Sequence, residues 1–255
     1  MNLNNNARVY EVYGGGQLGR VMNKKSVDAW ATQANAAATT AYNTEHAEWE
    51  ALTTDEKATT PEPQAPQPIE LSLGEGYTDT GLDNVLAIAR NGKKYNTNVI
   101  INQGADVCGY MYNGSLSGAY AYGGGLGNAN TPNTGDVHGT TYIALLGGKV
   151  TKDLYAAGTV GSVNNKYNVA TDDFDQPFIA SANAYIEGGT ARNVYGGGWQ
   201  GSVGYHAGGI DAATTSDVLG ETHVVIGKKD GDSFINGIPA IERNAYGGGY
   251  GNITL

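Results

Sequence analysis

Charged side chains that could cleave a glycan gather in one part of this chain. Asp172 and Asp173 follow Lys166 closely, and Arg192 lies a little further along. Acid–base cleavage of a sugar chain needs a positioned base or a pair of carboxyl groups. These four residues form a loose grouping whose spacing fixes no common geometry. We therefore expect no catalytic site, and we keep a β-helix polysaccharide lyase or glycoside hydrolase as the alternative.

The same acidic segment offers oxygen atoms that could bind calcium. Asp172, Asp173 and Asp175 lie close together, but the remaining ligands of an EF-hand loop are missing. A solvated acidic loop is therefore the simpler interpretation. We expect neither a metal ion nor any other cofactor, because the histidines also lack the spacing of zinc ligands: His46, His138, His206 and His223.

Two glycine-rich segments, residues 14–19 and 196–201, match the G-x-G-x-x-G pattern of dinucleotide-binding loops. A true fingerprint follows a strand, begins a helix and has an acidic residue about twenty positions later. Here a β-branched residue comes soon after each motif, and the motif itself recurs along the chain. We therefore interpret these glycines as corner turns between strands.

A repeated motif surrounds these glycines and is the strongest signal in the sequence. Valine and tyrosine favour extended backbone, and glycine permits tight corners. Strand and glycine turn also precede several of the corners, as in residues 142–148 and 184–189. This order predicts an all-β fold, a parallel β-helix or β-solenoid. The copies begin at Val12 (VYGGGQLGRV), Ala121 (AYGGGLGNAN), Leu154 (LYAAGTVGSV), Val194 (VYGGGWQGSV) and Ala245 (AYGGGYGNIT).

Each copy carries a tyrosine at its second position, and a small or aliphatic apolar residue precedes it. Stacked coils would align the tyrosines in a ladder with a spacing of about 4.8 Å. The apolar residues would face a narrow interior, and by alternation the tyrosines would point outward or into the corner, where their hydroxyls reach water. The expected structural residues are Tyr13, Tyr122, Tyr155, Tyr195 and Tyr246, with the corner glycines Gly196, Gly197 and Gly198.

The composition limits the kinds of protein that this can be. Glycine accounts for 39 of the 255 residues, and 16% of the residues are charged, against about 25% in ordinary proteins. The net charge of −10 disfavours binding to nucleic acid or to an anionic membrane. Cys108 is the only cysteine, so no internal disulfide can form, and we expect a buried structural thiol.

The ends of the sequence carry no targeting signal. Residues 1–6 contain neither a basic region nor an apolar run, and no stretch is long enough to span a membrane. The repeats begin within the first dozen residues and continue to the last one without a capping element. Because solenoids need caps, we expect a fragment of a longer protein, truncated at both ends.

A segment of different composition interrupts the repeats. Residues 26–52 are alanine-rich with apolar residues at helical spacing, and Ser26 is a candidate N-cap. Residues 60–68 hold four of the seven prolines and predict an extended linker, and residues 82–90 predict a second helix. We expect a first coil over residues 1–21, a helical and proline-rich insertion over 22–95, and further coils over 96–255.

The pattern T-x-V-x-I-x-G-G followed by V-Y-G-G-G-x-x-G-x-V resembles the glycine-rich repeats of large parallel β-helix proteins of gut Bacteroidetes, described as adhesin-like. The resemblance covers residues 8–21 and 96–255. It implies an extracellular or outer-surface location and a non-catalytic role in adhesion or as a stalk. Surface glycans or host proteins would be its partners.

Exposed aromatic side chains beside the corners are the candidates for binding such a partner. An aromatic ring can stack on a sugar or on a protein surface, and it can equally pack into the corner itself. The fold by itself does not supply an activity. The candidates are Trp199, Tyr205 and Tyr250.

Overall fold

The computed structural model describes residues 1–19, 21, 24–68, 95–131, 134–164, 179–204, 219–230 and 233–250. The chain divides into two compact units, one with the described strands and one with the described helices. The predicted β-rich class is confirmed, because the chain is mostly β and its main sheet is parallel and curled.

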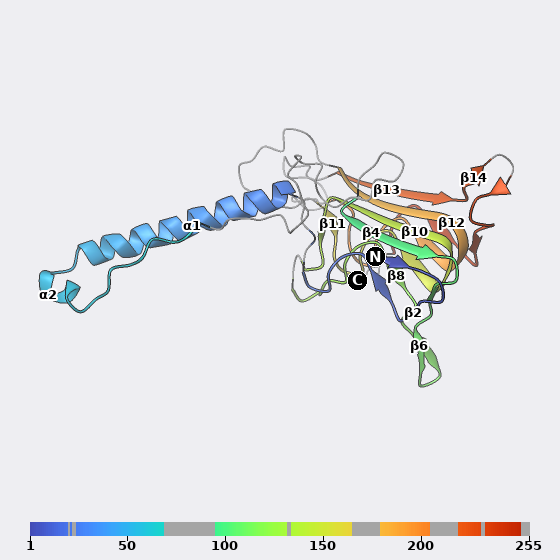
Figure 1. Ribbon diagram of the computed structural model, residues 1–255, viewed down its shortest axis with the longest axis horizontal. Coiled ribbons are helices and arrows are strands. Elements are labelled where there is room, and N and C mark those ends of the chain that lie inside the picture. Colours follow the sequence, from blue (N-terminus) through green and yellow to red (C-terminus); the bar gives the residue numbers. More distant parts are fainter. Residues whose placement is uncertain are drawn as a thin grey trace, which may run out of the picture. The chain divides into compact units, whose positions relative to one another are not determined.

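The main sheet has eleven strands and is curled (Figure 1). Its buried apolar side chains form the main hydrophobic cluster. The centre of the sheet is formed by the long strands β10 (Thr140–Tyr155) and β12 (Ile179–Tyr195), which pair in parallel with each other. The pairing is interrupted by register shifts near Leu146 and Val150, close to the predicted glycine turns. Shorter strands continue the sheet on both sides.

The strands of this sheet form five successive rungs within the described residues, and each rung pairs in parallel with the next. Rung 3 is β10 and rung 4 is β12. Rung 1 consists of β1 (Asn2–Leu3), β2 (Arg8–Val9) and β3 (Val12–Tyr13). Rung 2 consists of β4 (Thr97–Asn102), β5 (Asp106–Val107) and β8 (Ala121–Tyr122). Rung 5 consists of β13 (Leu219–Ile226), β16 (Ala240–Ile241) and β17 (Ala245–Tyr246).

The register places equivalent residues of the repeated motif beside one another. In this register Val12 pairs with Ala121, Ala121 with Leu154, and Leu154 with Val194. All four side chains are buried in the main hydrophobic cluster. Since side chains alternate along a strand, the neighbouring tyrosines lie on the other face. Removing these apolar side chains from water supplies the main stabilising contribution to the curled sheet.

Three smaller sheets accompany the main one. Strands β9 (Val137–His138) and β11 (Val163–Asn164) pair in parallel, and bridges to Val21 and Val203 extend this column. Strands β6 (Tyr110–Tyr112) and β7 (Ser115–Ser117) form an antiparallel hairpin. A second hairpin joins β14 (Lys229–Asp230) to β15 (Ser233–Phe234).

The helical unit contains α1 (Lys24–Glu50) and α2 (Thr54–Lys57). The N-cap predicted at Ser26 is wrong, because α1 already includes Lys24. Thr53 and Glu56 form a capping box at the start of α2. The Trp49 indole donates to the Thr60 carbonyl at 2.9 Å, which ties the segment after α2 to α1.

Residues 61–68 form neither helix nor strand, and the helix predicted over residues 82–90 lies outside the described residues. Neither described helix combines the length and the apolar character that crossing a membrane requires.

Candidate functional site

The structure places the five motif tyrosines in one column, one from each rung. Their ring centroids are 4.7 to 5.1 Å apart, and neighbouring ring planes differ by 6 to 11°. This spacing follows from the distance between paired strands. The column runs in the order Tyr13, Tyr122, Tyr155, Tyr195 and Tyr246.

The middle of this column is buried, and the Tyr155 hydroxyl does not reach solvent, which corrects the expectation for that tyrosine. Tyr122, Tyr155 and Tyr195 are buried, because each ring covers its neighbours and Tyr120 and Trp199 cover the side of the column. The Tyr155 hydroxyl has no hydrogen-bond partner among the described residues. Burial raises the pKa of the Tyr155 phenol well above its ordinary value, and the nearby carboxylate of Asp153 adds to the increase.

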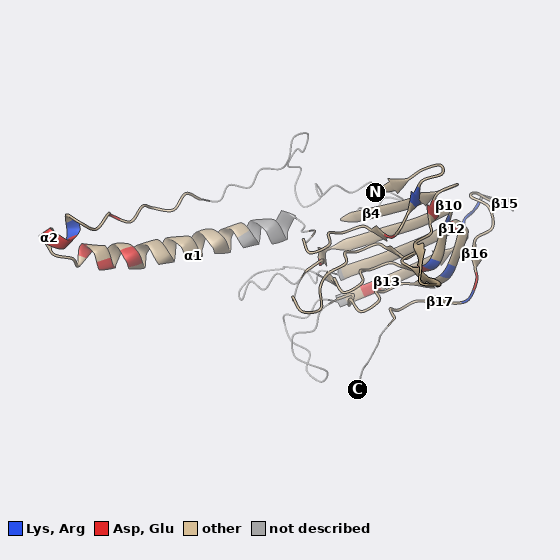
Figure 2. Cartoon of the chain, turned by 90° about the horizontal axis from the view of Figure 1, so that it is seen from below, with Lys and Arg blue, Asp and Glu red and all other residues tan. Residues whose placement is uncertain are grey.

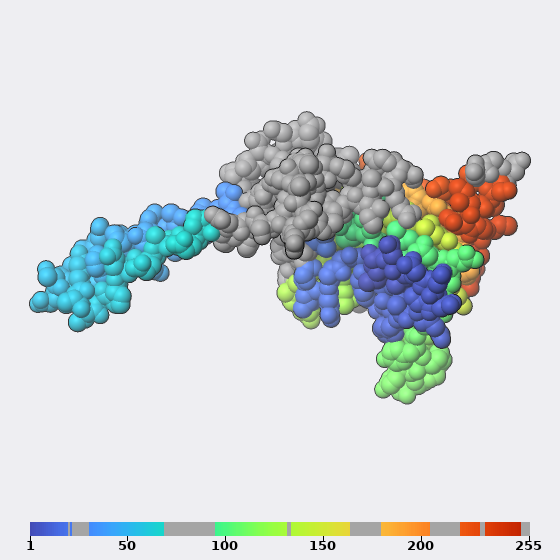
Figure 3. Space-filling view, in the orientation of Figure 1, coloured from blue at the N-terminus to red at the C-terminus, as the bar shows by residue number. Residues whose placement is uncertain are grey.

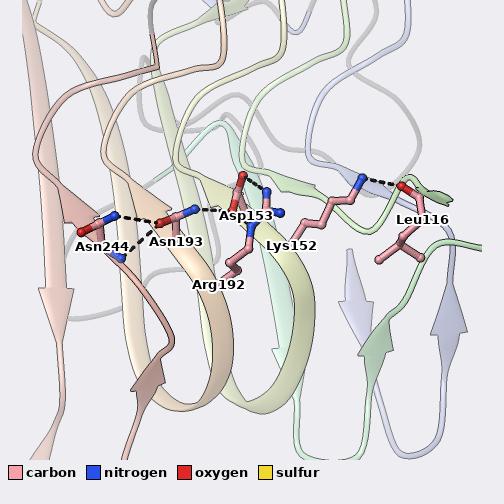
Figure 4. A network of polar contacts seen from close by, with 6 residues as sticks. All are labelled: Leu116, Lys152, Asp153, Arg192, Asn193 and Asn244. Atoms are coloured by element: carbon pink, nitrogen blue, oxygen red, sulfur yellow. Dashed lines mark hydrogen bonds and ion pairs between the residues drawn. The ribbon is translucent and has the colours of Figure 1, made fainter.

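A ladder of polar side chains runs along the residues that precede the tyrosine column (Figure 4). The Asp153 carboxylate is buried and accepts two hydrogen bonds from Arg192, at 2.8 and 2.6 Å. Asn193 donates to Asp153 at 2.8 Å and accepts from the backbone N–H of Asn244 at 3.1 Å. The hydrogen bonds to Asp153 raise the pKa of Arg192 further above its ordinary value. These contacts link rungs 3, 4 and 5.

This ladder gives Arg192 a structural role, and the catalytic role considered from the sequence remains an alternative. Its guanidinium is held by Asp153 and neutralises a carboxylate that would otherwise be buried without a counterion. The remaining members of the alternative catalytic group, Lys166, Asp172 and Asp173, lie outside the described residues, as does Asp175 of the calcium candidate. In the part of the chain that the structure describes, no cluster of three or more potential metal ligands occurs.

The aromatic candidates beside the corners have different environments. Trp199 is half-buried and packs against Tyr120 and Tyr155, each at 5.9 Å between ring centroids. The ring centroid of Tyr250 lies 4.6 Å from that of Trp199, and 42% of the surface of Tyr250 is exposed. Tyr205 lies outside the described residues. Trp199 therefore packs into the corner, whereas Tyr250 still presents a ring to solvent.

The β6–β7 hairpin carries a larger exposed aromatic surface. Asn113 and Gly114 have φ values of 47° and 76°, so they form the two-residue turn with left-handed backbone that suits a hairpin. Three consecutive side chains of β6 are exposed: Tyr110 by 55%, Met111 by 66% and Tyr112 by 64%. Figure 3 shows the hairpin, in light green, standing clear of the neighbouring surface.

Tyr10 of rung 1 extends this surface. Its ring centroid lies 5.0 Å from that of Tyr110, and Tyr110 in turn lies 6.5 Å from Tyr112. Tyr110 and Tyr112 share one face of the strand because side chains alternate. We call the row formed by Tyr10, Tyr110 and Tyr112 the tyrosine row.

The base of the hairpin is fixed to the main sheet by specific contacts. The hydroxyls of Tyr10 and Ser117 are 2.8 Å apart, and the Lys152 ammonium donates to the Leu116 carbonyl at 2.7 Å. Lys152 also lies over the Tyr120 ring. Gly118 has a positive φ of 74°, and a Cβ there would lie 2.3 Å from the Tyr10 ring. The hairpin is therefore held in place before any ligand arrives, which lowers the entropic cost of binding.

We did not expect this hairpin from the sequence, although a signal for it is present. Asn-Gly between Tyr-Met-Tyr and Ser-Leu-Ser is a strong hairpin pattern. Cys108, at the base of the hairpin, was expected to be buried. It is only half-buried, and its thiol approaches the Val9 carbonyl at 3.8 Å.

Comparison of the chain with known protein families, with curated proteins and with solved structures finds no match.

Proposed function

We propose that this chain is a non-catalytic binding module, in which a glycine-rich parallel β-solenoid displays an aromatic hairpin at a cell surface. The stacking of equivalent corners over five rungs supports the solenoid. The resemblance of the repeats to adhesin-like surface proteins supports the location and the role. The ladder that engages Arg192 supports a structural use of the charged residues next to the corners.

The observation that carries this proposal is the exposed tyrosine row. Large exposed apolar side chains grouped on one projection mark interaction surfaces. Tyrosine is well suited to such contacts, because a rigid ring provides area at low entropic cost and the hydroxyl provides hydrogen bonds. The row lies on a fixed hairpin and is exposed on three neighbouring rings.

The chemistry of the row favours a neutral glycan as its ligand. A sugar ring has an apolar C–H face that stacks on an aromatic ring, and hydroxyls that exchange hydrogen bonds with phenols. The protein has a net charge of −10, and few charged residues lie on the main sheet (Figure 2), so polyanionic ligands are disfavoured. A host protein that offers an apolar patch is the alternative partner.

An array of neutral glycans, acidic glycans and mucins tests this proposal directly. We expect the wild-type chain to bind neutral glycans, and we expect the double substitution Tyr110→Ala and Tyr112→Ala to weaken binding about tenfold or more. Ser115→Ala on the same hairpin is the matched control and should leave binding unchanged. Equal binding by the double variant, or no binding by the wild-type chain to any glycan or mucin, contradicts the proposal.

The corner aromatics provide a second, weaker contact in this proposal. Tyr250→Ala should lower binding by about two- to threefold, because a single partly exposed ring contributes less than the row. Release of sugar products from the array by the purified chain would overturn the non-catalytic assignment and favour the lyase or hydrolase alternative.

A further inference from the structure

The corners of successive rungs are joined by the same backbone hydrogen bonds. The N–H groups of Gly14, Gly123, Ala156 and Gly196 each donate to the tyrosine carbonyl of the following rung, at 2.8 to 2.9 Å. The N–H groups of the next residues along form a second series, which ends with Gly197 donating to Gly248. On rung 5 the equivalent donors are Gly247 and Gly248. Within the described residues they make none of these corner bonds.

Rung 1 presents the complementary acceptors. Tyr122 accepts from Gly14 and Gly124 accepts from Gly15, so the equivalent acceptors on rung 1 are the carbonyls of Tyr13 and Gly15. These two carbonyls accept no corner bond from any described residue. Among the described residues, one edge of the sheet therefore carries donors without a corner partner, and the opposite edge carries the matching acceptors. Such strand edges are templates for pairing with another chain.

The space beside the glycines follows the same arrangement. A Cβ at Gly14, Gly123 or Gly196 would lie 2.1 to 2.2 Å from a carbonyl oxygen of the following rung. A Cβ at Gly247 would meet nothing within 4 Å. At the opposite side of the rungs, a Cβ at Gly161 or Gly201 would lie too close to a carbonyl oxygen of a residue that precedes it in the chain. A Cβ at Gly19, the equivalent residue of rung 1, would meet nothing within 4 Å. At each edge, a glycine whose equivalents on the internal rungs are crowded by backbone therefore has open space beside it among the described residues.

The two edges also carry charges of opposite sign. Arg243 occupies on rung 5 the position that Arg192 occupies on rung 4, where Arg192 pairs with an acidic residue of an adjacent rung. Arg243 is exposed and makes no ion pair with any described residue. Glu11 occupies on rung 1 the position of Asp153. A rung 1 placed on rung 5 in the internal register would align Glu11 with Asn244, the residue after Arg243, so the acidic residue would lie on the following rung and not, as Asp153 does for Arg192, on the preceding one.

We propose that a second copy of this chain docks its rung 1 on rung 5 of the first copy, in parallel and in the register of the internal rungs. Val12 then lies beside Ala245, and Tyr13 stacks on the exposed face of Tyr246. The N–H groups of Gly247 and Gly248 donate to the carbonyls of Tyr13 and Gly15 of the second copy. Because the two surfaces differ, the contact is head-to-tail and can propagate into a filament.

Two substitutions block the two edges separately. Gly247→Val fills the open space on rung 5, and Gly19→Val fills the open space on rung 1, so neither should disturb the fold of a single copy. We expect the mass of the wild-type chain, measured by sedimentation at increasing concentration, to rise above the 26.5 kDa of one copy. Each variant alone should remain at the mass of one copy, because every head-to-tail contact needs both edges.

Mixing the two variants gives the decisive result. Gly19→Val retains a working rung 5 and Gly247→Val retains a working rung 1, so the mixture should form a complex of two copies and no larger species. This recovery also shows that both variants are folded. Lys149→Val, at an exposed position of the middle strand β10, is the matched control and should assemble like the wild-type chain.

Three outcomes would overturn the proposal. A wild-type chain that stays at the mass of one copy at all concentrations shows that the edges do not join copies. Assembly that persists in both single variants shows that copies associate through another surface. Failure of the mixture to form a pair, while circular dichroism shows both variants folded, excludes the head-to-tail register. None of these measurements depends on glycan binding.

Discussion

Tyr195 and Tyr246 occupy the same position of the same motif, one rung apart, yet their environments differ. Tyr195 is 7% exposed and has a stacked ring on each side, whereas Tyr246 is 44% exposed and stacks on Tyr195 alone among the described rings. Their local sequences, VYGGG and AYGGG, are nearly identical. The rung beyond a repeat residue therefore determines how far its side chain is buried. The motif determines only the face of the sheet on which that side chain lies.

The largest expected effect comes from adding a side chain at equivalent corner glycines. In Gly196→Val the new Cβ would lie 2.2 Å from the Gly247 carbonyl oxygen. Because backbone must move to relieve this contact, we expect the free energy of unfolding to fall by about 3 kcal/mol or more. Gly247→Val should change it by no more than about 0.5 kcal/mol. Urea unfolding of the two variants measures both values.

Equal losses for the two glycine variants would show that the corner backbone itself excludes a side chain, whatever lies beyond it. The natural sequence already argues against this, because rung 3 carries Ala156 and Ala157 at the positions of the first two corner glycines. A corner can therefore accept a methyl group where the adjoining backbone adjusts.

The polar ladder offers the second comparison. Asp153→Ala removes the acceptor of Arg192 and of Asn193, and it leaves a partly buried guanidinium without a counterion. We expect a loss of about 2 kcal/mol, below the usual cost for a fully buried pair, since the Arg192 side chain is 29% exposed. Asn244→Ala, at the exposed end of the ladder, should cost less than about 0.5 kcal/mol. Thermal unfolding of both variants at neutral pH checks this order, and the reverse order would contradict it.

The smallest effect is expected from removing single hydroxyls of the column. Tyr155→Phe removes a buried hydroxyl that has no partner among the described residues, so we expect stability to rise by up to about 1 kcal/mol. Tyr246→Phe should be neutral. A clear loss in Tyr155→Phe would show that the hydroxyl has a bound partner.

The same variant has a signature in pH dependence. The pKa of Tyr155 is raised in the folded chain, so above about pH 10 the unfolded chain releases this proton first. The contribution of the raised Tyr155 pKa to the free energy of unfolding is therefore complete below about pH 10 and is lost as the pH rises further. Tyr155→Phe should show a smaller loss of stability between neutral and strongly alkaline solution than the wild-type chain.

Much of the sheet could be predicted from the sequence, because one motif recurs. The apolar residue before each tyrosine indicated the buried face, and the glycines indicated the corners where rungs approach closely. Burial of the tyrosines could not be predicted, since it depends on covering side chains such as Tyr120 and Trp199, whose residue types do not recur at the equivalent positions of the other rungs. The pairing of Arg192 with Asp153 could not be predicted either. The two residues are distant in sequence, and only the register of rungs 3 and 4 brings them close.

The hairpin shows how the sheet accommodates additional residues between two strands of one rung. Residues 108–120 separate Val107 from Ala121 on rung 2, whereas residues 151–153 suffice between Val150 and Leu154 on rung 3. Strand β8 nevertheless keeps the same register with its neighbours on both sides. The number of residues between two strands of one rung can therefore differ without a change in the register of the sheet. Segments at this position can be lengthened, exchanged or diversified by evolution, or by an engineer, with little effect on how the rest of the molecule folds.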